Sequence, residues 1–164
     1  MLACVTTFAL EGITPRRVAV EVDVRPGLPA FTVVGLGDRA VRESRERVRA
    51  AIQNAGWPFP QQRVTVNLAP ADLRKEGPGF DLAIACGLLA ATGEVPSEAL
   101  HSTAIFGELA LGGELRSCRG ALAVAEGAAA AGLDRMVLPV GQVPDAARVA
   151  GCLLYPSDAA AALP

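Results

Sequence analysis

Aromatic residues, lysine and histidine are scarce in this chain. Aromatic residues make up only 4% of its 164 residues, so the core has to be built mainly from the Val, Leu, Ile and Ala that raise the hydrophobic fraction to 51%. Lys75 is the single lysine and His101 the single histidine. The net charge is −2, whereas domains that bind duplex DNA by themselves are usually basic. The overall charge therefore gives no support for tight nucleic-acid binding.

Metal-ligand patterns and membrane-spanning runs are also lacking. The four cysteines, Cys4, Cys86, Cys118 and Cys152, form no Cys-x-x-Cys pair, and a single histidine is available to complete a zinc site. We therefore expect no metal site and interpret the cysteines as small apolar residues. The longest uncharged apolar run, 82–92, is too short to span a bilayer, and the first residues lack a signal-peptide pattern. A reduced, cytoplasmic protein without a membrane partner is expected.

Hydrophobic periodicity predicts an α+β domain. The valines of 18–24 alternate with Ala19, Glu21 and Asp23, which is typical of a half-buried antiparallel strand. Residues 80–92 have no polar face, so they are expected to form a buried helix. Strands are expected at 2–10, 16–25, 30–36, 63–68, 103–115 (with a hairpin turn), 134–139 and 151–156, and helices at 37–56, 80–92, 119–132, 141–149 (one or two turns) and from 157 onwards. The hairpin-like first half and the alternating second half indicate a mixed sheet in one domain.

Residues 35–40, Gly-Leu-Gly-Asp-Arg-Ala, match the Gly-x-Gly-x-x-Ala fingerprint of a dinucleotide-binding turn between a strand and a helix. The fingerprint also requires an acidic residue at the end of the next strand, where this chain has Asn67 and Leu68. The strand before the motif is expected to be the third of a meander rather than the first of a βαβ unit. Dinucleotide binding is therefore not favoured, and Asp38 is expected to cap the helix.

Five arginines lie on the helix expected at 37–56, where they can bind phosphates or a protein partner. Four pairs of opposite charge at i,i+4 spacing can neutralise much of this charge locally: Asp38–Arg42, Arg39–Glu43, Arg42–Glu46 and Glu43–Arg47. A self-paired, solvated helix face is the first interpretation. Arg45 and Arg49 are the least paired, so they are the candidates for contact with DNA or with a partner.

The segment 67–81 combines charged side chains, glycines and the start of the buried helix. Pro78 suits the first turn of a helix, and free N–H groups at a helix start can bind an anion. Seven residues are candidates for an anion-binding or partner-binding site: Asp72, Arg74, Lys75, Glu76, Gly77, Gly79 and Asp81. Ser, Thr and Cys are absent from 67–81, so no nucleophile stands in this loop. The alternative interpretation is structural, with Asp72 and Asp81 binding backbone N–H groups of the loop.

Several long blocks of the sequence resemble known families. Three blocks are similar to the proteolytic domain of Lon-type proteases: 70–96, 106–116 and 132–139. Three more extend this to a closer resemblance to the amino-terminal domain of the magnesium-chelatase-like YifB/ComM family: 22–36, 40–56 and 63–82, the last reading RVTVNLAPADLRKEGPGFDL. The blocks occur in the family's order and cover nearly all of residues 1–155.

This resemblance implies a fold and a molecular context. The fold is that of the Lon proteolytic domain and of the ribosomal-protein second-domain-like fold, an α+β two-layer arrangement with a mixed sheet. Residues 1–155 form this domain, and 156–164 form a linker towards an AAA+ ATPase domain of a longer chain with a zinc-bearing segment beyond it. Competence members of the family are ring-forming helicases that drive branch migration during recombination of incoming DNA.

The same resemblance implies partners and cofactors. The expected partners are the chain's own AAA+ domain and the neighbouring subunits of a ring, a hexamer in the whole protein. ATP and Mg²⁺ are expected as cofactors of that whole protein and none for this fragment. DNA binding by the fragment is expected to be weak.

Comparison with Lon predicts that this domain has no peptidase activity. The Lon nucleophile is a serine in a Gly-Pro-Ser-Ala-Gly turn, and Gly79 stands at that position here. The Lon lysine falls near Leu122, where this chain has no lysine, and no Walker A motif occurs in these residues. We expect a non-catalytic domain of an AAA+ DNA-processing ATPase that serves ring assembly, DNA guidance or both. The alternatives are a chelatase-type protein-interaction subunit and a Lon-like hydrolase with a rearranged dyad.

Overall fold

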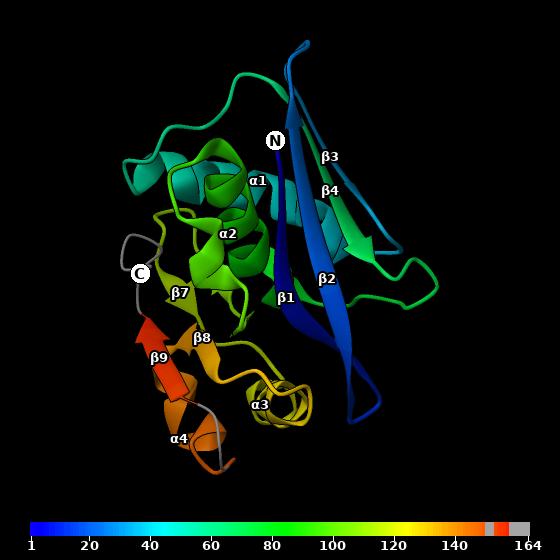
Figure 1. Cartoon of the computed structure of the whole chain (residues 1–164), viewed down its shortest axis with the longest axis vertical. Coiled ribbons are helices and arrows are strands. Elements are labelled where there is room, and N and C mark those ends of the chain that lie inside the picture. The colour runs from blue at the N-terminus through cyan, green and yellow to red at the C-terminus, as the bar shows by residue number, and fades with distance from the viewer. Residues whose placement is uncertain (150–152, 158–164) are drawn as a thin grey trace.

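A mixed β-sheet forms the centre of the structure, a computed structural model that describes residues 1–149 and 153–157. Within these residues seven strands lie in the order β3-β4-β2-β1-β5-β8-β9, and β6 and β7 form a separate two-stranded ribbon (Figure 1). The strands are β1 (Leu2–Glu11), β2 (Thr14–Arg25), β3 (Ala30–Val34), β4 (Arg63–Ala69), β5 (Thr103–Ile105), β6 (Glu108–Leu109), β7 (Leu115–Arg116), β8 (Arg135–Pro139) and β9 (Leu153–Ser157). The helices are α1 (Arg39–Asn54), α2 (Asp81–Thr92), α3 (Ala121–Ala130) and α4 (Val143–Ala146), with 3-10 turns η1 (Pro78–Phe80), η2 (Ser97–Leu100) and η3 (Val140–Gln142).

The sheet contains both strand directions, which confirms the predicted α+β fold with a mixed sheet. β1 and β2 form a long antiparallel hairpin, and β2 pairs antiparallel with β4. β1, β5, β8 and β9 continue the sheet in parallel. The prediction that β3 is the third strand of a meander is wrong. β3 pairs parallel with β4, and α1 connects the two strands as the crossover of a βαβ unit.

The two faces of the sheet are covered by different helices. Alternate side chains of a strand point to opposite faces, and the valines 18–24 of β2 pack with α1 and α2 in the main core. Figure 1 shows α1 and α2 along one side of the β1–β2 hairpin. On the opposite face, Phe8 of β1 and Met136 of β8 pack with α3 and α4 in a second core. The sheet with α1 and α2 gives the expected two layers, and α3, which packs mainly on β1 and β2, adds a partial third layer together with α4.

Helices α1 and α2 start and end as their sequences predict. Asp38 caps α1, since its Oδ1 accepts a hydrogen bond from the N–H of Val41 at 2.9 Å. α2 is buried over nearly its whole length, in agreement with its lack of a polar face. It ends at Gly93, whose φ of 84° is a conformation that glycine adopts without steric cost. α2 therefore carries its first residue, Asp81, directly into the core.

The last segment of the chain is described only in part. The strand predicted at 151–156 is found as β9, parallel to β8 and ending at Ser157. The helix start predicted from 157 onwards and most of the linker predicted at 156–164 lie outside the described residues. Along the described chain, none of the helices is both long and apolar enough to cross a bilayer.

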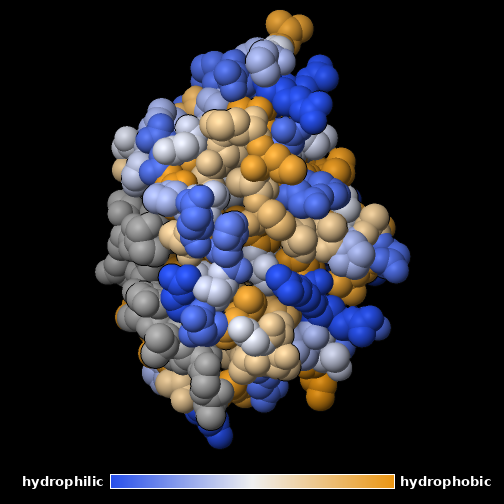
Figure 2. All heavy atoms as spheres, in the orientation of Figure 1, coloured by the Kyte–Doolittle hydropathy of each residue, from blue (hydrophilic) through white to orange (hydrophobic). Residues whose placement is uncertain are grey.

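Apolar side chains on the surface are dispersed. Among the large exposed ones are Ile13 in the β1–β2 turn, Leu28 before β3, and Val34 and Leu36 at its end. On the face shown in Figure 2, hydrophilic side chains interrupt the band of apolar ones. A contact made by this face therefore has to combine apolar and polar groups.

Candidate functional site

The loop of residues 70–80 lies against the turn that follows β3, so two segments that sequence analysis treats separately form one structure. The N–H of Lys75 donates to the carbonyl of Leu36 at 3.2 Å, and the carbonyl of Lys75 accepts from the N–H of Asp38 at 2.9 Å. Lys75 and Gly37 form an isolated parallel bridge. The loop after β4 therefore meets the βαβ unit at the start of α1.

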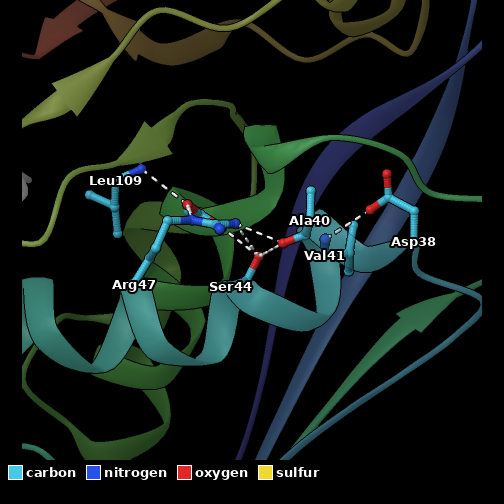
Figure 3. Close-up of polar contacts among 7 residues, drawn as sticks. Asp38, Ala40, Val41, Ser44, Arg47 and Leu109 are labelled. Carbon is cyan, nitrogen blue, oxygen red and sulfur yellow. Dashed lines mark hydrogen bonds and ion pairs between the residues drawn. The ribbon is translucent and has the colours of Figure 1, made fainter.

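Asp38 fixes this junction with both carboxylate oxygens. Oδ1 accepts from the N–H of Val41 (Figure 3), and Oδ2 accepts from the N–H of Gly77 at 3.0 Å, on the 70–80 loop. In dinucleotide-binding proteins the pyrophosphate of the ligand lies at the N-terminus of this helix. Here the carboxylate of Asp38 lies at the helix N-terminus. The fingerprint at 35–40 therefore forms a structural turn whose helix start is capped by its own carboxylate.

Asp81 lies at the centre of a buried polar network, and Figure 3 shows three residues of this network, Ser44, Arg47 and Leu109. Its carboxylate accepts hydrogen bonds from Arg47 Nε at 2.6 Å, Ser44 Oγ at 2.5 Å and the N–H of Leu109 at 3.2 Å. Arg47 Nη2 adds a bond to Oδ1 at 3.0 Å, so the ion pair is bidentate. Burial raises the pKa of Asp81 above its ordinary value, while the bonds from Arg47, Ser44 and Leu109 act in the opposite direction. With both oxygens occupied and the side chain fully buried, Asp81 acts inside the domain.

Lys75 is the other buried charged residue of the candidate set. Its side chain is fully buried, and Nζ donates to the carbonyl of Pro70. Burial lowers the pKa of Lys75, and the carboxylate of Asp72 opposes this shift. Neither Lys75 nor Asp81 presents a charged atom at the surface, so the structure places both out of reach of DNA or a protein partner.

The other charged residues of the 70–80 loop are exposed. Arg74 pairs with Glu76 at 2.8 Å, and Asp72 is exposed beside them. Together with the β1–β2 turn these three side chains line a shallow cavity of about 390 Å³. A solvent-exposed ion pair contributes little to stability, so Asp72, Arg74 and Glu76 are free to serve a contact.

A second cavity, of about 590 Å³, opens beside Gly77 and Gly79 and reaches Cys118 and Arg119. Cys118 carries the one thiol or hydroxyl group among its lining residues in the described part of the chain. Burial raises the pKa of Cys118 to about 12, so its thiol is protonated at neutral pH. The cavity therefore offers a binding space in which the thiol is not activated.

Gly79, at the position of the Lon nucleophile, has no space for a side chain. A Cβ on Gly79 would lie 2.5 Å from Cε2 of Phe106, closer than real side-chain contacts come. The N–H of Gly107 donates to the carbonyl of Gly79 at 3.0 Å, which holds the two segments together. Leu122, at the expected place of the Lon lysine, is a partly exposed residue of α3.

We expect the change Gly79→Ser to create no peptidase. A serine there still lacks a base, since Leu122 cannot accept a proton, and it forces Phe106 to move, which costs about 1–3 kcal/mol of stability. Hydrolysis of casein, labelling by a fluorophosphonate and thermal unfolding measure the two effects. Gly77→Ser is the control for acylation, because it adds a serine to the same loop in open space; its φ of 83° gives it a backbone strain of its own, so stabilities are compared with the unchanged chain. Acylation of the Gly79→Ser variant, but not of the control, would contradict this prediction.

The charges of α1 pair differently from expectation. Arg39 and Glu43 form the expected pair at 2.6 Å. Arg42 instead donates to the carbonyl of Gly37 at 3.1 Å, and Arg47 turns towards Asp81. Three expected pairs are not formed among the described residues, because their members bond elsewhere: Asp38–Arg42, Arg42–Glu46 and Glu43–Arg47.

Arg45 and Arg49 lie on the exposed side of α1, next to β3. Arg45 pairs with its neighbour Glu46 at 2.9 Å, and the guanidinium of Arg49 lies 5.5 Å from the centre of the Phe59 ring. Both arginines line a cavity of about 200 Å³ between α1 and the start of β3. They face solvent and stay candidates for contact with a partner.

Sequence reasoning missed Ser44 and Arg47 as the partners of Asp81. Ser44 is fully buried between Val41 and Val48 on the apolar stripe of α1. A polar residue on a buried stripe needs a hydrogen-bond partner. The position of Ser44 in the sequence therefore indicates that such a partner exists. The partner itself lies 37 residues away along the chain, and no local pattern identifies it.

Within the described residues, no group of three His, Cys, Asp or Glu side chains is arranged to hold a metal ion. Burial raises the pKa of Cys86 to about 12, as expected for a thiol inside the apolar helix α2.

Comparisons with known proteins fit this arrangement. Residues 20–142 match the family model described as subunit ChlI of Mg-chelatase. The chain is 46% identical over 136 residues to the uncharacterized protein YifB of Salmonella typhimurium (83% of this chain, 27% of that protein). It is 46% identical over 121 residues to the competence protein ComM of Haemophilus influenzae (74% and 24%). Lon protease 2 of Thermus thermophilus is more distant, at 31% over 137 residues (79% and 17%). The chain thus spans about a quarter of the length of YifB and ComM.

Proposed function

Since this chain belongs to the family of subunit ChlI of Mg-chelatase, we propose that it is a non-catalytic domain of an AAA+ ATPase that processes DNA. Similarity to a competence protein supports a role in branch migration during recombination of incoming DNA. The chain corresponds to about a quarter of that relative, and the remaining part of the whole protein supplies the ATPase, with ATP and Mg²⁺ as cofactors. The whole protein acts in the cytoplasm as a ring, a hexamer, in which this domain serves assembly, DNA guidance or both.

One observation carries the non-catalytic part of this proposal. The turn that provides the nucleophile in Lon is closed here, because Phe106 occupies the space of a side chain on Gly79. The adjacent carboxylate of Asp81 is consumed by Arg47, Ser44 and Leu109. These contacts turn the Lon-like site into a support for the fold, so its exposed rim, with Asp72, Arg74 and Glu76, is left for partner contacts.

The whole protein and a version without residues 1–157 test the proposal on branched DNA with ATP. We expect the truncated protein to lose branch migration. Loss of ring assembly would assign the domain to assembly, and intact rings with lost DNA movement would assign it to guidance. Unchanged branch migration without the domain would disprove both roles.

We expect Arg45→Ala, Arg49→Ala and Arg74→Ala to weaken ring assembly or branch migration by the whole protein, without changing the DNA affinity of the 164-residue chain. The acidic residues among these arginines suit a protein partner better than a phosphate backbone, and the net charge of −2 opposes DNA. If the arginines contact phosphates instead, each change flattens the salt dependence of DNA affinity by about one unit.

Arg16→Ala is the control for these changes, since Arg16 is an exposed arginine of the β1–β2 hairpin paired with Glu11. Fluorescence anisotropy with labelled DNA at several salt concentrations gives the affinities. Submicromolar DNA binding at physiological salt that none of the three arginine changes alters would contradict both the protein-partner role and the phosphate-binding role of these arginines.

The name of the family model favours one further candidate, a chelatase-type subunit that works through protein contacts. ATP-dependent insertion of Mg²⁺ into a porphyrin, measured with the whole protein and candidate partner subunits, separates the two functions. Metal insertion without activity on branched DNA would establish the chelatase-type role.

A further inference from the structure

β3 is an open edge of the sheet. Among the described strands its only neighbour is β4 (Figure 1). The N–H of Ala30 donates to the carbonyl of Gln62 at 3.3 Å, so Ala30 directs its backbone towards β4. Bonding residues alternate along a parallel pair, so Thr32 and Val34 also bond to β4. Phe31 and Val33 therefore point their N–H and C=O groups out of the sheet, where another strand can bind.

The sequence of β3 lacks the features that protect edge strands. Exposed edges of natural sheets usually carry lysine, other charged residues, proline or a bulge, which prevent pairing with another chain. Residues 30–34 read Ala-Phe-Thr-Val-Val, with neither charge nor proline, and pair with β4 in unbroken register. An edge of this composition is suited to being covered by a partner.

A row of arginines follows the same edge. Arg42 and Arg45 line a cavity of about 320 Å³ together with Phe31, Thr32 and Val33 of β3. Arg45 and Arg49 line the adjoining cavity of about 200 Å³ at the start of the strand, where Glu46 is the one acidic residue. The edge is therefore locally positive, although the chain as a whole carries a charge of −2.

The spacing of Arg45 and Arg49 matches that of alternate residues in a strand. At about 1.5 Å rise per helical residue, Arg45 and Arg49 are about 6 Å apart along α1. Side chains on one face of an extended peptide repeat every 6.6 Å or so. A strand added to β3 thus places one acidic side chain near Arg45 and the next acidic side chain on the same face near Arg49. The methylene groups of these acidic side chains then contact Phe31 or Phe59.

From this geometry we propose that the β3 edge binds an extended acidic segment of a protein partner, which adds a strand to the sheet and places alternate carboxylates on Arg45 and Arg49. This deepens the partner-contact role proposed above and rests on it. The outward N–H and C=O groups of Phe31 and Val33 favour a polypeptide over DNA, because a sugar-phosphate backbone offers acceptors for the N–H groups but no donors for the C=O groups.

A short capped peptide of alternating Thr and Glu tests the proposal against the 164-residue chain. We expect it to bind, while a peptide of alternating Thr and Lys does not. N-methylation at every second residue removes the outward donors of one edge only. When the methylated residues are those whose N–H groups face β3, Kd should rise at least about tenfold, which corresponds to the loss of roughly one hydrogen bond. When they are the alternate residues, whose N–H groups face away from β3, Kd should change little.

Variants of the chain locate the contact. Arg45→Ala and Arg49→Ala should each raise Kd about threefold, as expected for exposed charge pairs, whereas Arg16→Ala should not. Hydrogen exchange of the β3 amides distinguishes strand addition from binding by charge alone, because only a hydrogen-bonded strand protects individual amides. Peptide binding should slow exchange of the amides of Phe31 and Val33, with no change at Thr32 and Val34, whose amides already bond to β4.

Each other outcome overturns the proposal. Equal Kd values for the two N-methylated peptides would show that charge, and not strand addition, drives binding. Binding of oligothymidine with loss on Arg45→Ala, but no binding of the peptide, would assign the edge to single-stranded DNA. If no peptide binds and Arg45→Ala still weakens ring assembly, strand addition is wrong while the partner-contact function stands.

Discussion

The variant Asp81→Ala is expected to lose about 3 kcal/mol of free energy of unfolding, a large part of the stability of a single domain. The change removes the acceptor of four hydrogen bonds, from Arg47 (two bonds), Ser44 and the N–H of Leu109. Arg47 and Ser44 then keep the carbonyl of Ala40 as an acceptor in a mostly buried space, and a buried group that lacks part of its partners costs more than its bond contributed. Urea unfolding followed by circular dichroism measures the loss.

The exposed pair Arg39–Glu43 provides the matched control. Its length, 2.6 Å, equals that of Arg47–Asp81, but its side chains are largely exposed where Asp81 is fully buried. Glu43→Ala should therefore cost less than about 1 kcal/mol. Equal losses in both variants would show that the network around Asp81 does not support the fold, and the closed Lon-like turn would then need another explanation.

This network also shows why the sequence predicts part of the site and not the rest. The elements that carry it, α1 and α2, follow from periodicity and from the Asp38 cap, because these signals lie within a few residues. The pairing of Ser44 and Arg47 with Asp81 depends on how the two helices pack, and local charge spacing favoured a Glu43–Arg47 pair instead. Whether Arg47 pairs with the nearby Glu43 or with the buried Asp81 depends on the cost of desolvating these groups. The spacing of charges along the sequence contains no information on that cost.

The strand order was harder to predict than the strands. The alternation in β2 and β4 is visible in the sequence, and both strands were expected. The position of β3 at the edge, parallel to β4, depends on the crossover made by α1, and a short strand after a turn gives no local sign of its neighbour. Lys75 illustrates the same limit, since a lone lysine between Arg74 and Glu76 has the pattern of a surface residue but lies fully buried.

Gly35→Ala is expected to cost about 3 kcal/mol or more, and it tests the structural explanation of the dinucleotide-like fingerprint. Gly35 has a φ of 106°, and a Cβ there would lie 2.2 Å from the carbonyl oxygen of Leu68 in β4. The clash is with backbone, which cannot rotate away as a side chain does, so β3 and β4 must separate locally. The cost therefore combines an unfavourable φ with overpacking.

Gly56→Ala separates these two costs. Gly56 has a φ of 86°, yet a Cβ on it meets no atom within 4 Å, so this variant should lose only about 1 kcal/mol. Thermal and urea unfolding of both variants give the difference that belongs to the Leu68 contact. If Gly35→Ala is no less stable than Gly56→Ala, the close approach of β3 to β4 is not what requires glycine in the fingerprint. A larger loss in Gly35→Ala than in Gly56→Ala instead ties the motif to the position of β3, because the same turn brings Leu36 to Lys75 and holds the open edge in place.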